Sequence, residues 1–125
     1  MNLKKIDSVC IWSSDPDDLQ KFYKETLELT LDKKLEFSND YGYQFTVNGV
    51  FLFIDRHDGV AGRAKDPNRM MVGFGVDSVK KVYDELKMKG VKVIAEPFAA
   101  PEGGYYVTTI EDPEGNILQF FNDNP

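Results

Sequence analysis

The chain has 125 residues, 42% hydrophobic and 29% charged, which suits a single soluble globular domain with a sizeable core. Its net charge of −6 argues against a nucleic-acid partner, because binding phosphates needs a basic surface. One cysteine, Cys10, excludes an internal disulfide and fits a reducing compartment. No apolar run approaches the ~20 residues that cross a bilayer, and the N-terminus lacks a signal-peptide pattern. We therefore expect a cytoplasmic protein without a membrane partner.

The first half of the chain predicts one helix followed by a set of strands. Asp15 is a suitable helix N-cap, and Pro16 fits the first helical position. Apolar residues at helical spacing then extend the helix over residues 16–28. Strands are predicted on both sides of it, at residues 6–12, 30–37, 42–48 and 50–55. The Asn48-Gly49 pair between the last two strands is a strong hairpin signal.

The second half predicts the same order of elements. The polar segment 56–69 is a candidate linker, so module 1 spans about residues 1–55 and module 2 about 70–125. Ser78 caps the second helix and Gly90 ends it. Strands are predicted at residues 70–76, 91–94, 105–110 and 117–121. An offset of 63 residues superposes the first strands and the helix caps, which indicates a βαβββ unit present twice in one α+β domain. The alternative is an ordinary α+β domain whose halves look alike by chance.

Residue alternation separates two faces on the first and last strands of each unit. One face is wholly aliphatic or aromatic, as expected beneath the helices; its members are Val9, Ile11, Leu52, Ile54, Val72, Phe74, Val76, Leu118 and Phe120. The other face, called the second face below, mixes sizes and polarities; its members are Ser8, Cys10, Trp12, Phe51, Phe53, Asp55, Met71, Gly73, Gly75, Ile117, Gln119 and Phe121. Such a face is either a second core or a pocket wall, and its glycines favour a pocket.

Three segments carry a resemblance to a known superfamily. They are IDSVCIWSSD with the helix behind it, VGFGVDSVKKVYDELKMKGV at 72–91 and DPEGNILQFF at 112–121. In this order they resemble the vicinal oxygen chelate superfamily, which contains glyoxalase I, extradiol dioxygenases and bleomycin-resistance proteins. The resemblance implies two βαβββ modules that form an incomplete barrel around a concave site, in a protein that is commonly a homodimer.

The resemblance also implies where a metal would bind. Metal-using members place His and Glu ligands at four positions, which here hold Ser8, Phe53, Met71 and Gln119. A catalytic divalent metal prefers imidazole and carboxylate ligands, and none is present at these positions. We therefore expect no metal and no other cofactor.

Other candidates for chemistry are weaker. His57, the only histidine, lies in an Asp-Gly turn and is expected to be a solvated loop residue, with general acid–base work at a pocket mouth as the alternative. Cys10 is expected to be a buried, inert thiol. The residues Asp112 and Glu114 belong to a turn and are not expected to be a catalytic pair. No catalytic residue is predicted.

The favoured hypothesis is a metal-independent protein that is similar to the bleomycin-resistance branch. It would bind a small apolar or aromatic molecule, neutral or cationic, in an aromatic-lined groove. The predicted ligand-binding residues are Ser8, Trp12, Phe51, Phe53, Met71, Gln119 and Phe121. The alternative is an enzyme, a glyoxalase-type lyase or a dioxygenase, with non-standard metal ligands such as His57, Asp55 or Gln119. A third possibility is a dimeric module with no small-molecule role.

Overall fold

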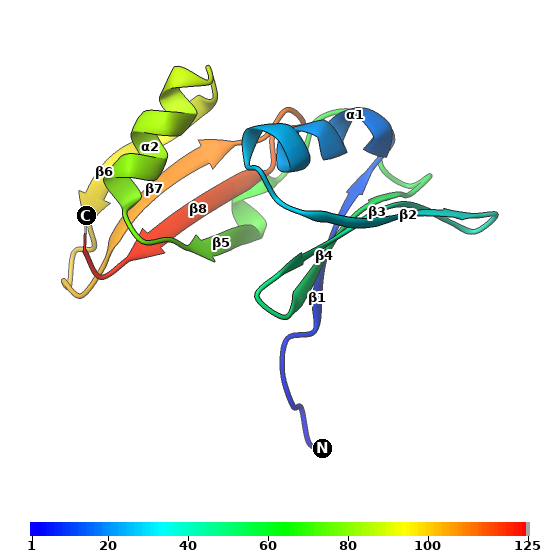
Figure 1. The fold of residues 1–125 in the computed structure, drawn as a ribbon, viewed down its shortest axis with the longest axis horizontal. Coiled ribbons are helices and arrows are strands. Elements are labelled where there is room, and N and C mark those ends of the chain that lie inside the picture. The colour runs from blue at the N-terminus through cyan, green and yellow to red at the C-terminus, as the bar shows by residue number, and fades with distance from the viewer. Residues whose placement is uncertain (125) are drawn as a thin grey trace. The chain divides into compact units, whose positions relative to one another are not determined.

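The structure is a computed structural model that describes residues 1–124 (Figure 1). The chain divides into two compact units, Met1–Gly62 and Arg63–Pro125, and each is described by itself. Among the described residues, no helix is long and apolar enough to cross a membrane.

The first unit is a four-stranded sheet with one helical segment. Its strands are β1 (Ser8–Ser13), β2 (Leu31–Phe37), β3 (Asp40–Val47) and β4 (Val50–Arg56). They lie in the order β1-β4-β3-β2, with β1 parallel to β4 and the other neighbours antiparallel. The helix α1 (Pro16–Lys21) continues as a π-helical turn, η1 (Phe22–Thr26).

The second unit repeats this arrangement. Its strands are β5 (Met71–Gly75), β6 (Lys92–Ala99), β7 (Tyr106–Glu111) and β8 (Ile117–Asn122), in the order β5-β8-β7-β6. A short 3₁₀ helix, η2 (Pro67–Arg69), precedes β5, and α2 (Val79–Met88) connects β5 to β6. In Figure 1 α2 lies against the sheet, and it packs on β6, β7 and β8.

The two units match in strand register as well as in element order. Ser8 pairs with Phe51 in the first unit, and Met71, which is 63 residues after Ser8, pairs with Ile117 in the second. The predicted α+β class and the pair of βαβββ modules are therefore confirmed. Both sheets are open, with β1 and β2 at the edges of one and β5 and β6 at the edges of the other.

Both helices begin as predicted, and the first departs from a plain α-helix before its end. The side chains of Asp15 and Ser78 accept hydrogen bonds from the backbone N–H groups of Asp18 and Lys81, both at 3.2 Å. From Phe22 the backbone winds more loosely, and the N–H of Leu27 donates to the carbonyl of Phe22, five residues back. The predicted helix over 16–28 thus exists, as an α-helical and then a π-helical segment.

Strand β6 is longer than the predicted 91–94, because it runs through Pro97 to Ala99. Proline lacks the N–H that an inner strand must donate, but β6 lies at an edge of the sheet. Register shifts on both sides of Ala95 accommodate the irregular segment. Pro97 is therefore compatible with an edge strand.

The helix-facing side of each sheet forms the core. In the first unit Leu19 and Tyr23 of the helical segment and Phe45 and Ile54 of the sheet are fully buried. In the second unit the fully buried apolar side chains are Val79, Ile110 and Leu118. The predicted helix-facing residues of β4 and β8 thus form part of the core, and the second face is the side left for a site.

The turn before β8 is built on one buried aspartate. Asp112 accepts hydrogen bonds at 2.9 Å from the backbone N–H groups of Glu114 and Asn116 and from the Asn116 side chain. Gly115 has a φ of 82°, a left-handed conformation that suits glycine. The predicted turn at 112–116 is confirmed, and Asp112 is a structural residue within it.

Candidate functional site

The second face of β1 and β4 carries the aromatic residues predicted for a ligand site. Trp12 on β1 is 43% exposed, and Phe51 and Phe53 on β4 are half-buried. The rings of Phe51 and Phe53 are 6.0 Å apart. Ser8 begins the same face and is exposed. The fold therefore brings four of the predicted residues onto one face of two adjacent strands.

One row of side chains crosses this face perpendicular to the strands. In register, Trp12 pairs with Asp55, Asp55 with Gly42, and Gly42 with Leu35. A Cβ atom on Gly42 would collide with Oδ1 of Asp55 and with the β4 backbone, so the carboxyl group of Asp55 occupies the space above this glycine. Gly42 thus provides the room for a buried carboxyl group beside Trp12.

The environment of Asp55 disfavours its charged form. The side chain is only 5% exposed, and burial is the main cause that raises the pKa of Asp55 to about 6, with the nearby Asp40 carboxyl group adding to the effect. The backbone N–H of Tyr43 opposes it by stabilising the carboxylate. Asp40 itself is exposed. The protonated, neutral form of Asp55 therefore persists to a higher pH than in an ordinary aspartate.

His57 and Cys10 border this row. The imidazole ring of His57 meets Trp12 edge to face, with ring centroids 5.3 Å apart. Its Nδ1 accepts the backbone N–H of Gly59 at 2.9 Å, so a neutral His57 carries its proton on Nε2. The expectation that Cys10 is buried is wrong, because the residue is exposed next to Phe53. Partial desolvation and then Asp55 and Asp40 raise the pKa of the Cys10 thiol, which keeps it protonated.

The second face of β5 and β8 holds the other predicted residues. Met71 is 39% exposed, and Gln119 is half-buried, with its Nε2 3.5 Å from Oγ1 of Thr109 on β7. The expectation that both glycines leave space is correct for one of them. A Cβ atom on Gly73 would lie 2.7 Å from the ring of Phe121, so that ring fills the space. Nothing lies within 4 Å of such an atom on Gly75.

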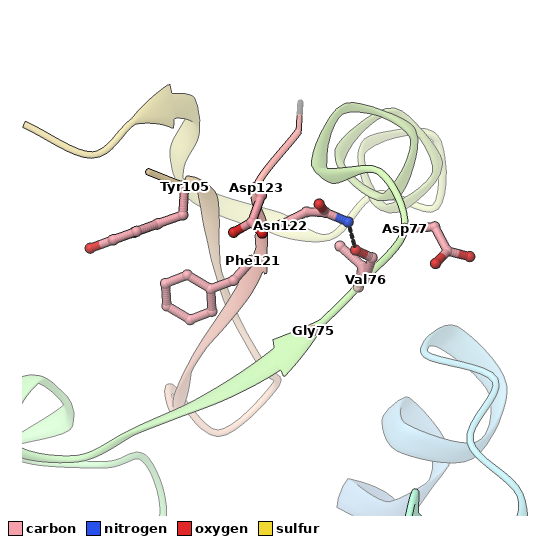
Figure 2. A pocket seen from close by; sticks show the side chains of 7 residues that line it. All are labelled: Gly75, Val76, Asp77, Tyr105, Phe121, Asn122 and Asp123. Carbon is pink, nitrogen blue, oxygen red and sulfur yellow. Dashed lines mark hydrogen bonds between the residues drawn. The ribbon is translucent and has the colours of Figure 1, made fainter. Parts of the chain in front are cut away.

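An open hollow of about 370 Å³ lies at the end of this face (Figure 2). Its lining residues come from the ends of β5 and β8 and from the loop before β7; they are Gly75, Val76, Asp77, Tyr105, Phe121, Asn122 and Asp123. Figure 2 shows the rings of Tyr105 and Phe121 on one side, and their centroids are 5.6 Å apart. The Asn122 side chain donates to the Val76 carbonyl and joins the two strand ends. Phe121 thus links the hollow to the rest of the second face.

The four positions that the resemblance assigns to metal ligands do not fit a divalent metal. Phe53 has no donor atom, Met71 offers a thioether, and Ser8 and Gln119 offer neutral oxygens. Among residues 1–124, no three His, Cys, Asp or Glu side chains gather into a metal-binding group. His57 and Asp55 therefore lack the third ligand that a non-standard site would need.

Sequence reasoning placed Asp55 on the second face and considered it only as a ligand of a non-standard metal site, and it did not single out Asp40 as a site residue. A signal was present, because a glycine inside a strand often marks a close approach of another group. The strand register that sets Gly42 opposite Asp55 was not available from the sequence. The binding role of the seven selected residues stays a prediction.

Comparison with known proteins places this geometry in a family. The profile of the Glyoxalase/Bleomycin resistance protein/Dioxygenase superfamily matches residues 5–120. The chain belongs to this superfamily. The resemblance to vicinal oxygen chelate proteins is therefore confirmed.

Individual members of the superfamily show how far the likeness reaches. A probable chloroplastic lactoylglutathione lyase of Arabidopsis thaliana is 28% identical in an alignment of 123 residues, gaps included, that covers 89% of this chain and 33% of that protein. The chain thus spans about a third of the length of this relative. A glyoxalase family protein from Enterococcus faecalis superposes with a TM-score of 0.79 at 22% identity, over 98% of this chain and all of that one. A lactoylglutathione lyase from Agrobacterium tumefaciens gives 0.74 at 18% identity, over 97% and 95% of the two chains. At these identities the structural matches support the fold alone.

Proposed function

We propose that this superfamily member binds a small apolar or aromatic molecule on its second face without a catalytic metal. The observation that carries the proposal is the aromatic surface of β1 and β4, where Trp12 is 43% exposed beside half-buried Phe51 and Phe53. Exposed aromatic side chains with a few placed polar groups are typical of small-molecule sites. Ser8 begins the same face of β1, and Met71, Gln119 and Phe121, the other predicted residues, lie on the second face of the other unit.

A ligand screen tests the proposal through Trp12, the only tryptophan. A library of aromatic antibiotics and metabolites is screened for a rise in melting temperature and for a change in Trp12 fluorescence. We expect a subset of compounds to change both. Phe53→Ala should weaken their binding by about tenfold, because a stacked aromatic contact contributes roughly 1 kcal/mol.

Phe98→Ala is the matched control, because Phe98 is a partly exposed phenylalanine of β6 outside the proposed site. It should leave the affinities unchanged. Absence of any response across a broad library contradicts the proposal, and so does equal weakening by both variants.

Metal independence has its own measurement. Protein purified without added metal should contain fewer than about 0.1 metal ions per chain, since a genuine site is near stoichiometric. Ligand binding should survive treatment with a chelator. Near-stoichiometric Ni²⁺, Zn²⁺, Fe²⁺ or Mn²⁺, or loss of binding on chelation, contradicts this part of the proposal.

A second candidate is a glyoxalase-type lyase, and the observation in its favour is the 28% identity to a probable lactoylglutathione lyase. It predicts turnover of hemithioacetals that needs an added divalent metal and is lost on chelation. The chemistry of Ser8, Phe53, Met71 and Gln119 argues against it. Activity with added metal would reverse the order of the two candidates.

We also propose that the protein functions as a homodimer, because members of the superfamily are commonly dimers. Light scattering after gel filtration measures this directly, because one chain has a mass of 14.2 kDa. The dimer predicts twice that mass at micromolar concentration. The mass of a single chain at every micromolar concentration measured would contradict the dimer.

A further inference from the structure

The hollow in the second unit has two aromatic walls. The ring of Tyr105 is 43% exposed and meets the half-buried ring of Phe121 at an interplanar angle of 64° (Figure 2). Phe121 pairs in register with Val107 of β7, which is two residues after Tyr105. By strand alternation both rings therefore lie on the second face, and together they offer an aromatic surface to the open space.

Gly75 keeps this space open. It pairs in register with Phe121, so a side chain at this position would stand next to the ring. A Cβ atom on Gly75 would have nothing within 4 Å, and the residue is not among the glycines with a positive φ. Neither a close neighbour nor the backbone conformation thus requires a glycine here. The result is a hollow of about 370 Å³, which has room for a small organic molecule.

The charge around the hollow is negative. Its lining includes Asp77 and Asp123 and contains no Lys, Arg or His. The chain segments that supply the lining, residues 70–79 and 100–125, also contain no basic residue. Among the residues that the structure describes, neither carboxylate makes a hydrogen bond or an ion pair. The hollow therefore offers accessible, unpaired negative charge, which attracts a cation.

The two carboxylates are not equivalent. Asp77 directly precedes Ser78, the N-cap of α2, so its charge offsets the positive end of the helix dipole. Figure 2 shows the Asp77 side chain pointing away from the two rings, whereas the carboxyl group of Asp123 lies on the side of Tyr105. Asp123 is therefore the carboxylate that a cation beside the rings would meet.

The aromatic walls favour a weakly hydrated cation. A primary ammonium group holds its water strongly, and an open hollow gives it few hydrogen bonds in exchange. A metal ion is disfavoured too, because no three His, Cys, Asp or Glu side chains gather anywhere in the described part of the chain. A quaternary ammonium group has no N–H to satisfy and presents methyl groups to aromatic rings.

We propose that the hollow binds the trimethylammonium group of a small organic cation. Its methyl groups contact Tyr105 and Phe121, and its charge faces Asp123. The ligand is choline-like and lacks an anionic group next to the ammonium, since Asp77 and Asp123 would repel one. This site goes beyond the proposed function, because only residues of the second unit line it, whereas that proposal is carried by the aromatic surface of β1 and β4.

Three small probes separate shape from charge. They are choline, its neutral isostere 3,3-dimethylbutan-1-ol and 2-aminoethanol, which is a primary ammonium at pH 7.5. Binding is followed by the shift of the Asn122 side-chain amide in ¹H–¹⁵N spectra, because this group lines the hollow and donates to the Val76 carbonyl. We expect choline to bind about fivefold more tightly than either other probe. Nuclear Overhauser effects from the choline methyl groups to the ring of Tyr105 should accompany the shift.

Equal binding of choline and its neutral isostere would show that the hollow reads shape alone, and it would overturn the inference. Equal binding of choline and 2-aminoethanol would assign recognition to the carboxylates and overturn it as well. No shift of the Asn122 amide with any probe would also overturn it.

Filling the hollow is the most direct variant test. Gly75→Leu places a side chain in the open space beside Phe121 and should weaken choline binding by about tenfold or more. Gly75→Ala is its matched control and should change the affinity by less than about twofold, because its methyl group meets no neighbour. Unchanged binding in a folded Gly75→Leu protein would overturn the inference.

Side-chain variants test the rings and the charge without filling the space. Tyr105→Leu should weaken choline about threefold, and Tyr105→Phe should bind as the wild type does. Asp123→Asn should also weaken choline about threefold. Asp58→Asn is the matched control, because Asp58 is a fully exposed aspartate outside the hollow, and it should have less than about a twofold effect. Equal weakening by the two asparagine variants, or none in Tyr105→Leu, would overturn the inference.

The proposed function has a separate readout. Choline should leave the Trp12 indole resonance in place, and Phe53→Ala should keep its affinity within about twofold, because neither residue lines the hollow. A response of Trp12 without one of Asn122, or loss of choline binding in Phe53→Ala, would overturn this inference and leave the proposed function standing. Failure of the broad ligand screen beside intact choline binding would contradict the proposed function and support the site in the hollow.

Discussion

The strand pairs β1–β4 and β5–β8 have the same register but carry different side chains at equivalent positions of their second faces. Trp12 and Asp55 are paired in the first unit, and at the equivalent places Gly75 and Phe121 are paired in the second. The first unit therefore has an aromatic ring on the edge strand beside a buried acid. The second has an open glycine on the edge strand beside an aromatic ring. The repeated backbone sets positions for side chains, and the side chains alone set the chemistry.

Glycines have different tasks in the two units. Gly42 makes room for a carboxyl group, Gly73 makes room for the ring of Phe121, and Gly75 borders open space in the hollow. The change in the free energy of unfolding on Gly→Ala substitution at each position measures how closely neighbouring atoms pack against the glycine.

The largest effect is expected at Gly42. In Gly42→Ala the new Cβ would collide with the Ile54 carbonyl, with Cα of Asp55 and with its carboxyl group, and two of these are backbone atoms that cannot move aside. We expect a loss of about 3 kcal/mol or more in the free energy of unfolding, measured by urea denaturation.

Gly75→Ala is the matched control, because its Cβ meets nothing within 4 Å. Alanine is favoured over glycine in a strand, so this variant should be as stable as the wild type or more stable by about 0.5 kcal/mol. Equal losses in the two variants would show that Gly42 is not closely packed against β4.

The next effect concerns the turns that lead into the last strand of each unit. Asp112→Ala removes three hydrogen bonds from a buried carboxylate, and we expect a loss of about 2–3 kcal/mol. The corresponding turn before β4 is built from Asn48 and Gly49 with φ angles of 46° and 85°.

Asn48→Ala should lower the free energy of unfolding by about 1 kcal/mol, because only a preference for the left-handed backbone conformation is lost. A larger loss for Asn48→Ala than for Asp112→Ala in urea denaturation would contradict this ranking.

Asp55→Asn is expected to increase the free energy of unfolding at pH 7.5 by a moderate amount, whereas Gly42→Ala, Asp112→Ala and Asn48→Ala decrease it. The pKa of Asp55 is raised to about 6 in the folded protein, from about 4 in the unfolded chain. The stability that protonated Asp55 contributes is complete below about pH 4 and is lost as the pH rises through about 6. Because solvent near Asp40 screens the pair, we expect the wild type to lose about 1–2 kcal/mol of stability as the pH rises from 4 to 7.5.

The asparagine variant should therefore be more stable than the wild type by this amount at pH 7.5 and equal to it at pH 4. Urea midpoints at the two pH values measure the difference. Asp58→Asn should match the wild type at both values. Lower stability of Asp55→Asn at pH 7.5 would mean that the donor to the carboxylate, the backbone N–H of Tyr43, outweighs burial and the repulsion from Asp40.

The smallest effect is expected for Gly73→Ala. Its Cβ would meet the far edge of the Phe121 ring, which can rotate toward the hollow. We expect a loss of about 0.5–1 kcal/mol in urea denaturation. In a Phe121→Ala background the same substitution should have no destabilising effect, and a loss that persists there would place the strain elsewhere.

The sequence sufficed for the fold because its signals were local and were repeated. The helix caps Asp15 and Ser78 and the turn at residues 112–116 predicted where elements begin and end, and the 63-residue offset related the two halves. The π-helical winding after Lys21, the short helix η2 and the extension of β6 from Ile94 to Ala99 were missed, since each depends on the surroundings of the segment.

The site was less predictable, because it depends on contacts between strands. Alternation placed Trp12, Phe53 and Gln119 on the correct face, but the alignment of Asp55 with Gly42 follows from the β3–β4 register. Similarly, whether a glycine leaves a cavity depends on its neighbours, and Gly73 and Gly75 differ in this respect. Gln119 was predicted as a ligand-binding residue; among the described residues its amide group makes one weak hydrogen bond, to Thr109, and its binding role stays a prediction.

The exposed thiol of Cys10 has a practical consequence. It is the only cysteine of the chain, and it pairs in register with Phe53, beside the proposed binding surface. An environment-sensitive maleimide dye would therefore attach at one defined point, after reaction at mildly alkaline pH to overcome the raised pKa of the thiol. The unmodified protein is thus ready for conversion into an optical biosensor for whatever occupies that surface.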